Sequence, residues 1–177
     1  MSRFQVMFED FMRDHYEESN SEGQTPLMLL MKEGFVTKDF VAQLLKKEKD
    51  INRRDNQGRT ALMYAIHYAN SVDTVKCLLE HGADINALDN NRRSALHYEA
   101  DSPCFSEGRL IVLLEGGANP LALDKQGATP LTLAKKHVIA FYKDALSRLE
   151  KATDAAQTKR AQTMAKQMDW YIDRSKE

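Results

Sequence analysis

The sequence of 177 residues predicts an all-α solenoid of about four helix–turn–helix units. Two sequence blocks repeat in phase along the chain. The first is a turn leading into a helix, residues 55–62 (DNQGRTAL), which returns at 89–96 and 124–131. The second is a helix end, residues 78–84 (LLEHGAD), which returns at 113–119 (LLEGGAN). One such pair of helices cannot bury its own apolar face, so neighbouring units must stack.

Each unit is predicted to start its first helix at a Ser or Thr followed by Ala or Pro and then Leu. The hydroxyl can accept a hydrogen bond from a free backbone N–H of the first turn. These starts lie at Thr25, Thr60, Ser94 and Thr129. A polar turn leads to a second helix, such as residues 72–80, and Gly82 or Gly117 stands where that helix ends. The units are predicted at about 21–54, 55–88, 89–123 and 124–151.

These blocks resemble the ankyrin repeat. The resemblance rests on residues 23–27 (GQTPL), residues 78–87 (LLEHGADINA) and a period near 33 residues, and it covers roughly residues 22–150. It implies an ankyrin-repeat solenoid at 21–151. In that family the turn tips and the first helices line a concave groove that binds another protein.

Both ends of the solenoid are predicted to carry an extra helix. Residues 1–20 are predicted to form an amphipathic helix with acidic residues on one face. We expect it to cap the first unit, and the alternative is a detachable docking helix. Residues 152–177 form a second amphipathic helix, whose apolar stripe is out of phase with the helix before it. This C-terminal helix folds back on the solenoid, pairs with a second copy to give a homodimer, or binds a partner.

Three departures from the repeat pattern stand out in the third unit. Glu99 takes a position that is apolar in the other units. We expect an ion pair with Arg92, Arg93 or His97, and the alternative is a side chain that extends outward to solvent. Arg92 also replaces a turn glycine and is expected to be strained if its φ is positive. Residues 100–108 predict a longer loop, in which Phe105 is either an exposed contact or a product of drift in the loop.

The sequence contains no pattern typical of catalysis or metal binding. The formal net charge of −1 argues against a nucleic-acid binder. Two cysteines, Cys77 and Cys104, have no metal-ligand spacing around them. No secretory signal or membrane-spanning apolar segment is evident. We therefore expect no enzyme, no cofactor, no metal and no membrane insertion, and a cytoplasmic location in the source cell or in a host cell that receives the protein.

The resemblance places the candidate binding residues on the turn tips and first helices of the central units. Arginine and tyrosine, the residue types that anchor interfaces, are concentrated there. The candidates are Arg53, Arg54, Asn56, Gln57, Arg59, Tyr64, Tyr68, Asn90, Asn91, Arg93, Tyr98, Asp101, Lys125 and Gln126. We expect this groove to bind an acidic or phosphorylated protein segment. The alternatives are a scaffold that self-assembles through the C-terminal helix and a bacterial or viral effector delivered into a host.

Overall fold

A computed structural model describes residues 19–33, 37–46, 48 and 50–134. The predicted C-terminal helix at 152–177 lies outside these residues, as do most of the predicted capping helix at 1–20 and the rest of the fourth unit after 134.

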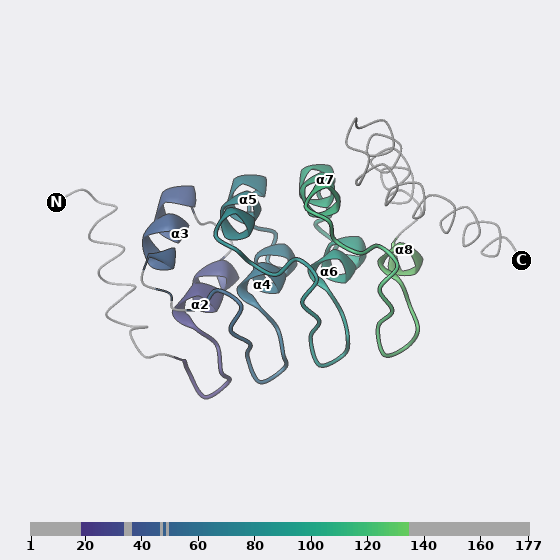
Figure 1. Cartoon of the computed structure of the whole chain (residues 1–177), viewed down its shortest axis with the longest axis horizontal. Helices are drawn as coiled ribbons and strands as arrows, with labels where there is room; N and C mark the ends of the chain where they lie inside the picture. Colours follow the sequence, from purple (N-terminus) through teal and green to yellow (C-terminus); the bar gives the residue numbers. More distant parts are fainter. Residues whose placement is uncertain (1–18, 34–36, 47, 49, 135–177) are drawn as a thin grey trace, which may run out of the picture.

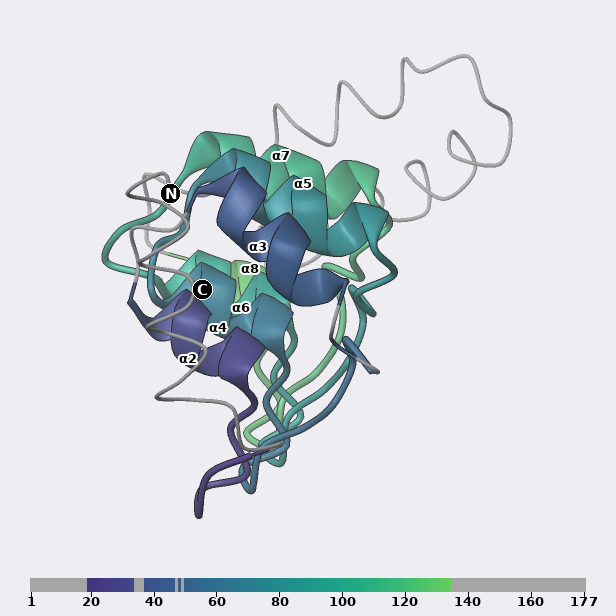
Figure 2. The ribbon, with the colours of Figure 1, turned by 90° about the vertical axis from the view of Figure 1, so that its left-hand side faces the viewer.

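The described residues form helices in two stacked rows, with no strand among them. The first helices of the units contact one another along one row, and the second helices contact one another along the other. The first row is α2 (Pro26–Lys32), α4 (Ala61–His67), α6 (Ala95–Asp101) and α8 (Pro130–Leu133). The second row is α3 (Lys38–Leu45), α5 (Val72–Glu80) and α7 (Glu107–Glu115). Figure 2 shows the two rows from their end, and the repeated all-α architecture is confirmed.

Capping residues fix where the first helices begin, although not always as predicted. Thr25 Oγ1 accepts the Met28 N–H, and Thr129 caps α8 in the same way. The helix start at Ser94 is instead stabilised by His97, whose Nδ1 accepts the backbone N–H of Ser94 at 3.0 Å. Thr60 makes no capping bond, and its hydroxyl has no hydrogen-bond partner among the described residues. The capping prediction was therefore wrong at Thr60.

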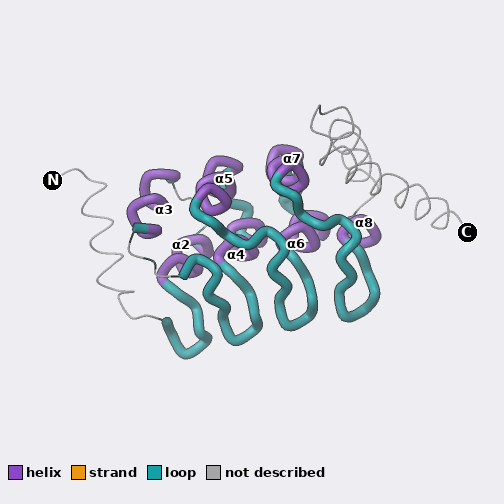
Figure 3. Tube along the Cα trace, viewed as in Figure 1, coloured by secondary structure: helices purple, strands orange, loops and turns teal. Residues whose placement is uncertain are grey.

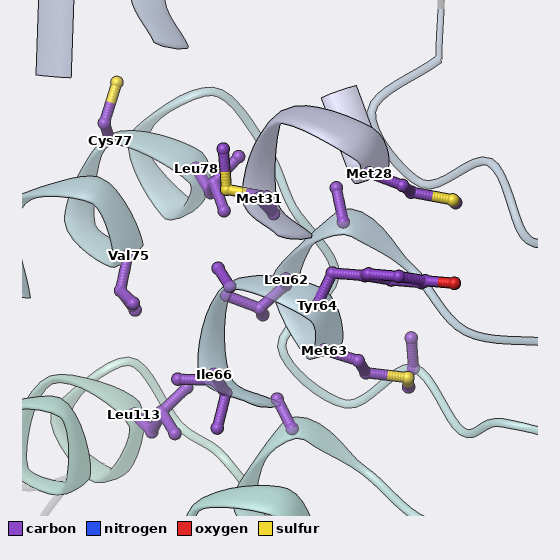
Figure 4. Packing of buried hydrophobic residues seen from close by; sticks show 14 of the residues in the cluster. Met28, Met31, Leu62, Met63, Tyr64, Ile66, Val75, Cys77, Leu78 and Leu113 are labelled. Atoms are coloured by element: carbon purple, nitrogen blue, oxygen red, sulfur yellow. The ribbon is translucent and has the colours of Figure 1, made fainter. Parts of the chain in front are cut away.

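The hydrophobic core lies between the two rows of helices (Figure 4). Leu62 and Ile66 of α4 are packed with Leu78 of α5 and Leu113 of α7, and none of the four is more than 1% exposed. Burying an aliphatic side chain of this size contributes roughly 1.5–3 kcal/mol. Units that share such side chains cannot fold independently, so the stack is cooperative.

The turn tips extend from one side of the stack and form a row of their own (Figure 3). In the second unit, Asp55 Oδ1 accepts the backbone N–H groups of Gln57 (2.9 Å) and Arg59 (2.8 Å), which closes the turn. Asp89 and Asp124 close the next two tips with the same pair of bonds.

Backbone hydrogen bonds then join each tip to the one before it. The N–H of Asn90 donates to the Gln57 carbonyl at 2.8 Å, and the N–H of Lys125 donates to the Asn91 carbonyl at 2.9 Å. The row of tips is therefore held at the spacing of the units.

Glu99 is completely buried and forms an ion pair, as expected, but its partner is Arg109 of α7. Arg109 Nε lies 2.7 Å from Glu99 Oε2, and its Nη2 donates to Oε1 at 3.2 Å. Burial raises the pKa of the Glu99 carboxyl, while the hydrogen bonds from Arg109 and the Ser106 N–H act in the opposite direction. The three partners suggested by the sequence were wrong because they lie on the tip or on the same helix, whereas Glu99 faces α7.

This ion pair belongs to a buried polar network that links three units. Arg109 Nη1 donates to the Asn70 carbonyl at 3.2 Å, and Asn70 Nδ2 donates to the Met31 carbonyl at 2.7 Å. Asn70 is fully buried at the end of the α4–α5 loop. The network therefore fixes the inter-helix loops of consecutive units against one another.

The predicted irregular loop of the third unit is short. Residues 102–106 connect α6 to α7, one residue more than the 68–71 connection between α4 and α5. Gly108 falls in the predicted loop of residues 100–108, but it lies inside α7, where a Cβ would come within 2.8 Å of Val72 Cγ2. Phe105 is half-buried and packs against the core, which favours loop drift over the alternative of an exposed contact residue.

Candidate interaction surface

An Asp–Arg–Tyr set occurs in the second unit and again, at the same register, in the third. The corresponding positions of the fourth unit have Asp, Ala and Leu. The central units thus share a polar arrangement where each tip meets its first helix. We call the side chains that surround it the tyrosine–arginine cluster. Its members are Arg59, His67, Tyr68, Arg93, Tyr98 and Asp101.

In the second unit the three side chains of the set are all hydrogen-bonded to one another. Arg59 Nε donates to Asp55 Oδ2 at 2.8 Å, and its Nη2 donates to the Tyr64 hydroxyl at 2.6 Å. The Tyr64 hydroxyl donates to Asp55 Oδ2 at 2.9 Å and accepts from Gln24 Nε2 at 2.7 Å. The hydroxyl has one proton and two lone pairs, so its hydrogen-bonding capacity is filled.

These hydrogen bonds shift the pKa values of Asp55 and Tyr64. Burial raises the pKa of the Asp55 carboxyl, but the hydrogen bonds from Arg59 and Tyr64 outweigh it and leave the value below normal. Burial, with the hydrogen bond to Asp55, raises the pKa of Tyr64 to about 12. Asp55 and Arg59 are therefore a charged pair at neutral pH, and Tyr64 is a neutral phenol.

Tyr64 was predicted on the binding surface, and the structure places it in the core instead. Only 2% of it is exposed, and its ring lies near Met28 and Met63 (Figure 4). The assignment of Tyr64 to a contact surface is therefore corrected. Its role is to hold Arg59 in place, since the Arg59 guanidinium lies 4.7 Å from the centre of the ring.

In the third unit the same residue types take a more open arrangement. Tyr98 donates to Asp89 Oδ2 at 2.8 Å, and the Arg93 guanidinium lies 5.0 Å from the centre of its ring. Arg93 Nη2 turns outward to Asp101 Oδ2 at 2.9 Å, where half of the Asp101 side chain is exposed. Arg93 Nε has no hydrogen-bond partner within the described part of the chain. The third unit therefore presents a half-buried arginine whose partner is on the surface.

Three rings connect the two sets. His67 is exposed, and its ring meets the rings of Tyr68 (4.9 Å) and Tyr98 (5.7 Å) edge to face. Tyr68 in turn stacks on Tyr64 at 5.8 Å. Desolvation, together with the charges of Arg59 and Arg93, lowers the pKa of His67 and so favours the neutral form of the ring. The result is an uncharged aromatic platform between two arginines.

Some of the other predicted site residues are exposed, and others form hydrogen bonds that hold neighbouring tips together. Asn56 Nδ2 donates to the Ser21 carbonyl and Asn90 Nδ2 to the Asn56 carbonyl, each at 3.0 Å, so both amides join neighbouring tips. Arg53 is half-buried and bonds Ser19 Oγ at 3.3 Å. The remaining exposed candidates on the tips are Arg54, Gln57, Asn91, Lys125 and Gln126.

Sequence reasoning named the arginines and tyrosines but missed the aspartates that hold them. Asp55 and Asp89 are both buried, and they connect each tip to its first helix. The recurrence of aspartate four residues before arginine and nine before tyrosine was a usable signal. In the described residues no group of three His, Cys, Asp or Glu side chains could hold a metal ion.

Comparison with known proteins agrees with this geometry. The family model for ankyrin repeats (3 copies) matches residues 6–89. Residues 6–89 are therefore similar to ankyrin repeats. Beyond the matched residues, α6, α7 and α8 continue the same two rows of helices and the same row of tips. A search of curated proteins found no match.

Ankyrin repeats are, in general, modules for protein–protein interaction rather than enzymes. None of the described helices is long and apolar enough to cross a membrane.

Proposed function

We propose that this chain is an adaptor that binds another protein through the tyrosine–arginine cluster and the adjoining tips. The observation that carries the proposal is the aromatic platform formed by His67, Tyr68 and Tyr98 between Arg59 and Arg93. Aromatic and arginine side chains are enriched among residues that dominate binding energy. Here they are also held rigid by neighbours, which reduces the entropy lost when a partner binds.

The charges of this surface support an acidic partner, although not through a row of free arginines. Arg59 is already paired with Asp55, so it contributes a fixed guanidinium at the edge of the surface more than an open positive charge. Arg93 is different, because its partner Asp101 is half exposed and can be replaced by a carboxylate from outside. We therefore expect an acidic or phosphorylated partner segment to bind nearer the third unit than the second.

The proposal is tested by partner capture with matched variants. The full chain, a His67→Ala/Tyr68→Ala variant and an Asp73→Ala/Lys76→Ala control are each used to purify proteins from the native source. Asp73 and Lys76 are exposed on α5, in the other row of helices, and their loss leaves the net charge unchanged. Circular dichroism confirms that all three chains are folded.

We expect the aromatic variant to lose a partner that the wild type and the control both retain. Capture should also weaken as salt is added, because charge contacts at a surface are screened. A partner held equally by all three chains would contradict binding at the aromatic platform.

We place this function in the cytoplasm of the source cell, or of a host cell if the protein is delivered. Support comes from the thiols, since Cys77 and Cys104 are both free. Self-assembly through residues 152–177 stays a prediction, because that helix lies outside the described residues.

A further inference from the structure

The third tip has an arginine where the other described tips have glycine. Gly23, Gly58 and Gly127 have φ values of 75°, 77° and 77°, and Arg92 has a φ of 60° at the same register. A residue with a Cβ is strained in this left-handed conformation, whereas glycine adopts it freely. Strained residues of this kind are concentrated at functional sites.

Glycine is needed at the earlier tips for a second reason, which is the close approach of the following tip. A Cβ on Gly58 would lie 2.6 Å from Oδ1 and 2.9 Å from the backbone N of Asn90. A Cβ on Gly23 would lie 2.7 Å from Oδ1 of Asn56. In both places the asparagine sits over the glycine and donates its amide N–H to a carbonyl of the preceding tip.

At the junction between the third and fourth tips, the third tip lacks the glycine and the fourth tip lacks the asparagine that would lie over it. Lys125 occupies the register of Asn56 and Asn90, and its N–H still bonds the Asn91 carbonyl. No side-chain hydrogen bond joins Lys125 to the preceding tip within the described residues. The glycine and the asparagine are thus replaced together, by two cations on adjacent tips.

Both cations are exposed and uncompensated. Arg92 and Lys125 are solvent-exposed, and neither has an ion-pair partner among the described residues. Arg59 and Arg93 are ion-paired with Asp55 and Asp101, whereas Arg54 Nη1 donates to the neutral backbone carbonyl of Leu88. Arg92 and Lys125 therefore place two positive charges without a described carboxylate partner on neighbouring tips.

We propose that Arg92 and Lys125 form a carboxylate-binding subsite for an acidic segment of the partner protein. This inference rests on the proposed function and adds a position and a chemistry to it. Asp101 supports the choice of carboxylates, because an Asp side chain already pairs with Arg93, next to Arg92. The third and fourth tips thus lack one relaxed glycine turn and one inter-tip hydrogen bond. In their place they have two positive charges, which would attract and bind an acidic segment.

The test uses a variant that should gain stability while it loses binding. Arg92→Gly removes the strained conformation, and Lys125→Asn restores the amide that the first tips use to bond the preceding tip. The control, Lys46→Gln/Lys76→Gln, changes the net charge by the same amount at two exposed lysines away from the tips. The probe is a fluorescein-labelled oligoglutamate peptide, measured by anisotropy at low ionic strength.

We expect the Arg92→Gly/Lys125→Asn chain to bind oligoglutamate about fivefold more weakly than the wild type, from two exposed charge contacts. Its melting temperature should be higher by about 3 °C, since a relaxed glycine replaces a strained residue. The control should match the wild type in both measurements.

The subsite would be overturned if the wild type did not bind oligoglutamate, or if the variant and the control bound it equally weakly. It would also be overturned if the melting temperature of the variant were unchanged or lower. A failure of the proposed function is recognised separately, from partner capture by the His67→Ala/Tyr68→Ala chain. If that chain loses the native partner while the tip variant keeps it, the aromatic platform binds the partner and the tip subsite does not.

Discussion

Replacing Arg109 by methionine should destabilise the chain by about 3–5 kcal/mol, the usual consequence of removing one partner from a buried ion pair. Arg109 makes two hydrogen bonds to the Glu99 carboxylate and others to the carbonyls of Asn70 and Cys104. Glu99 is completely buried, and after the change its remaining donor is the Ser106 N–H at 2.6 Å. Its negative charge would then be buried without a counter-charge.

The size of this effect is large relative to the whole stability of a domain, about 5–15 kcal/mol. Urea unfolding followed by circular dichroism measures it directly from the midpoint and slope. The informative comparison is a double-mutant cycle in which Glu99→Leu is combined with Arg109→Met. Leucine is the residue at the equivalent position of the first unit, Leu30.

We expect the double variant to be more stable than Arg109→Met alone, because no unpaired charge remains in the core. It should still be less stable than the wild type by about 1–3 kcal/mol, since the carbonyls of Asn70 and Cys104 lose their donor. The coupling energy should therefore be at least about 2 kcal/mol. Additive effects of the two single changes would refute the conclusion that this ion pair is a single buried unit.

Three further predictions concern the tips and first helices. Burial lowers the pKa of His97 below 6.5, so folding favours the neutral form of its ring. The free energy of unfolding should therefore be highest above about pH 6.5 and should fall as the pH drops toward the pKa of the folded state. Urea titrations at a series of pH values should show a weaker pH dependence for His97→Asn. Gly58→Ala should lower the melting temperature more than Gly127→Ala does. Both glycines have a positive φ, but only a Cβ at position 58 would lie 2.6 Å from Asn90 Oδ1. Equal melting temperatures for the two variants would contradict this. Tyr64→Phe should cost about 1–3 kcal/mol in urea unfolding, because it leaves buried polar groups without their partner, and a change below about 0.5 kcal/mol would mean that the hydroxyl is not holding the tip.

The fold could be predicted because its signals are local. A capping hydroxyl, a helix-ending glycine and a tip aspartate each act within a few residues, and the solenoid repeats them at a fixed spacing. The binding surface was predicted less well. Arg59 and Tyr64 were selected as exposed residues of an interaction-prone type, but one is paired with Asp55 and the other is buried.

The sequence alone determined that this protein is a stack of helix pairs with a row of tips, and that its third unit departs from the others. Only the tertiary structure decided what those departures do. Glu99 meets Arg109 on the next helix, and Arg92 lies beside a tip that lacks the usual asparagine. The physical reason is that such pairings depend on how helices are rotated and how units are spaced in the stack. Those quantities are set by packing across the core and are absent from any short stretch of sequence.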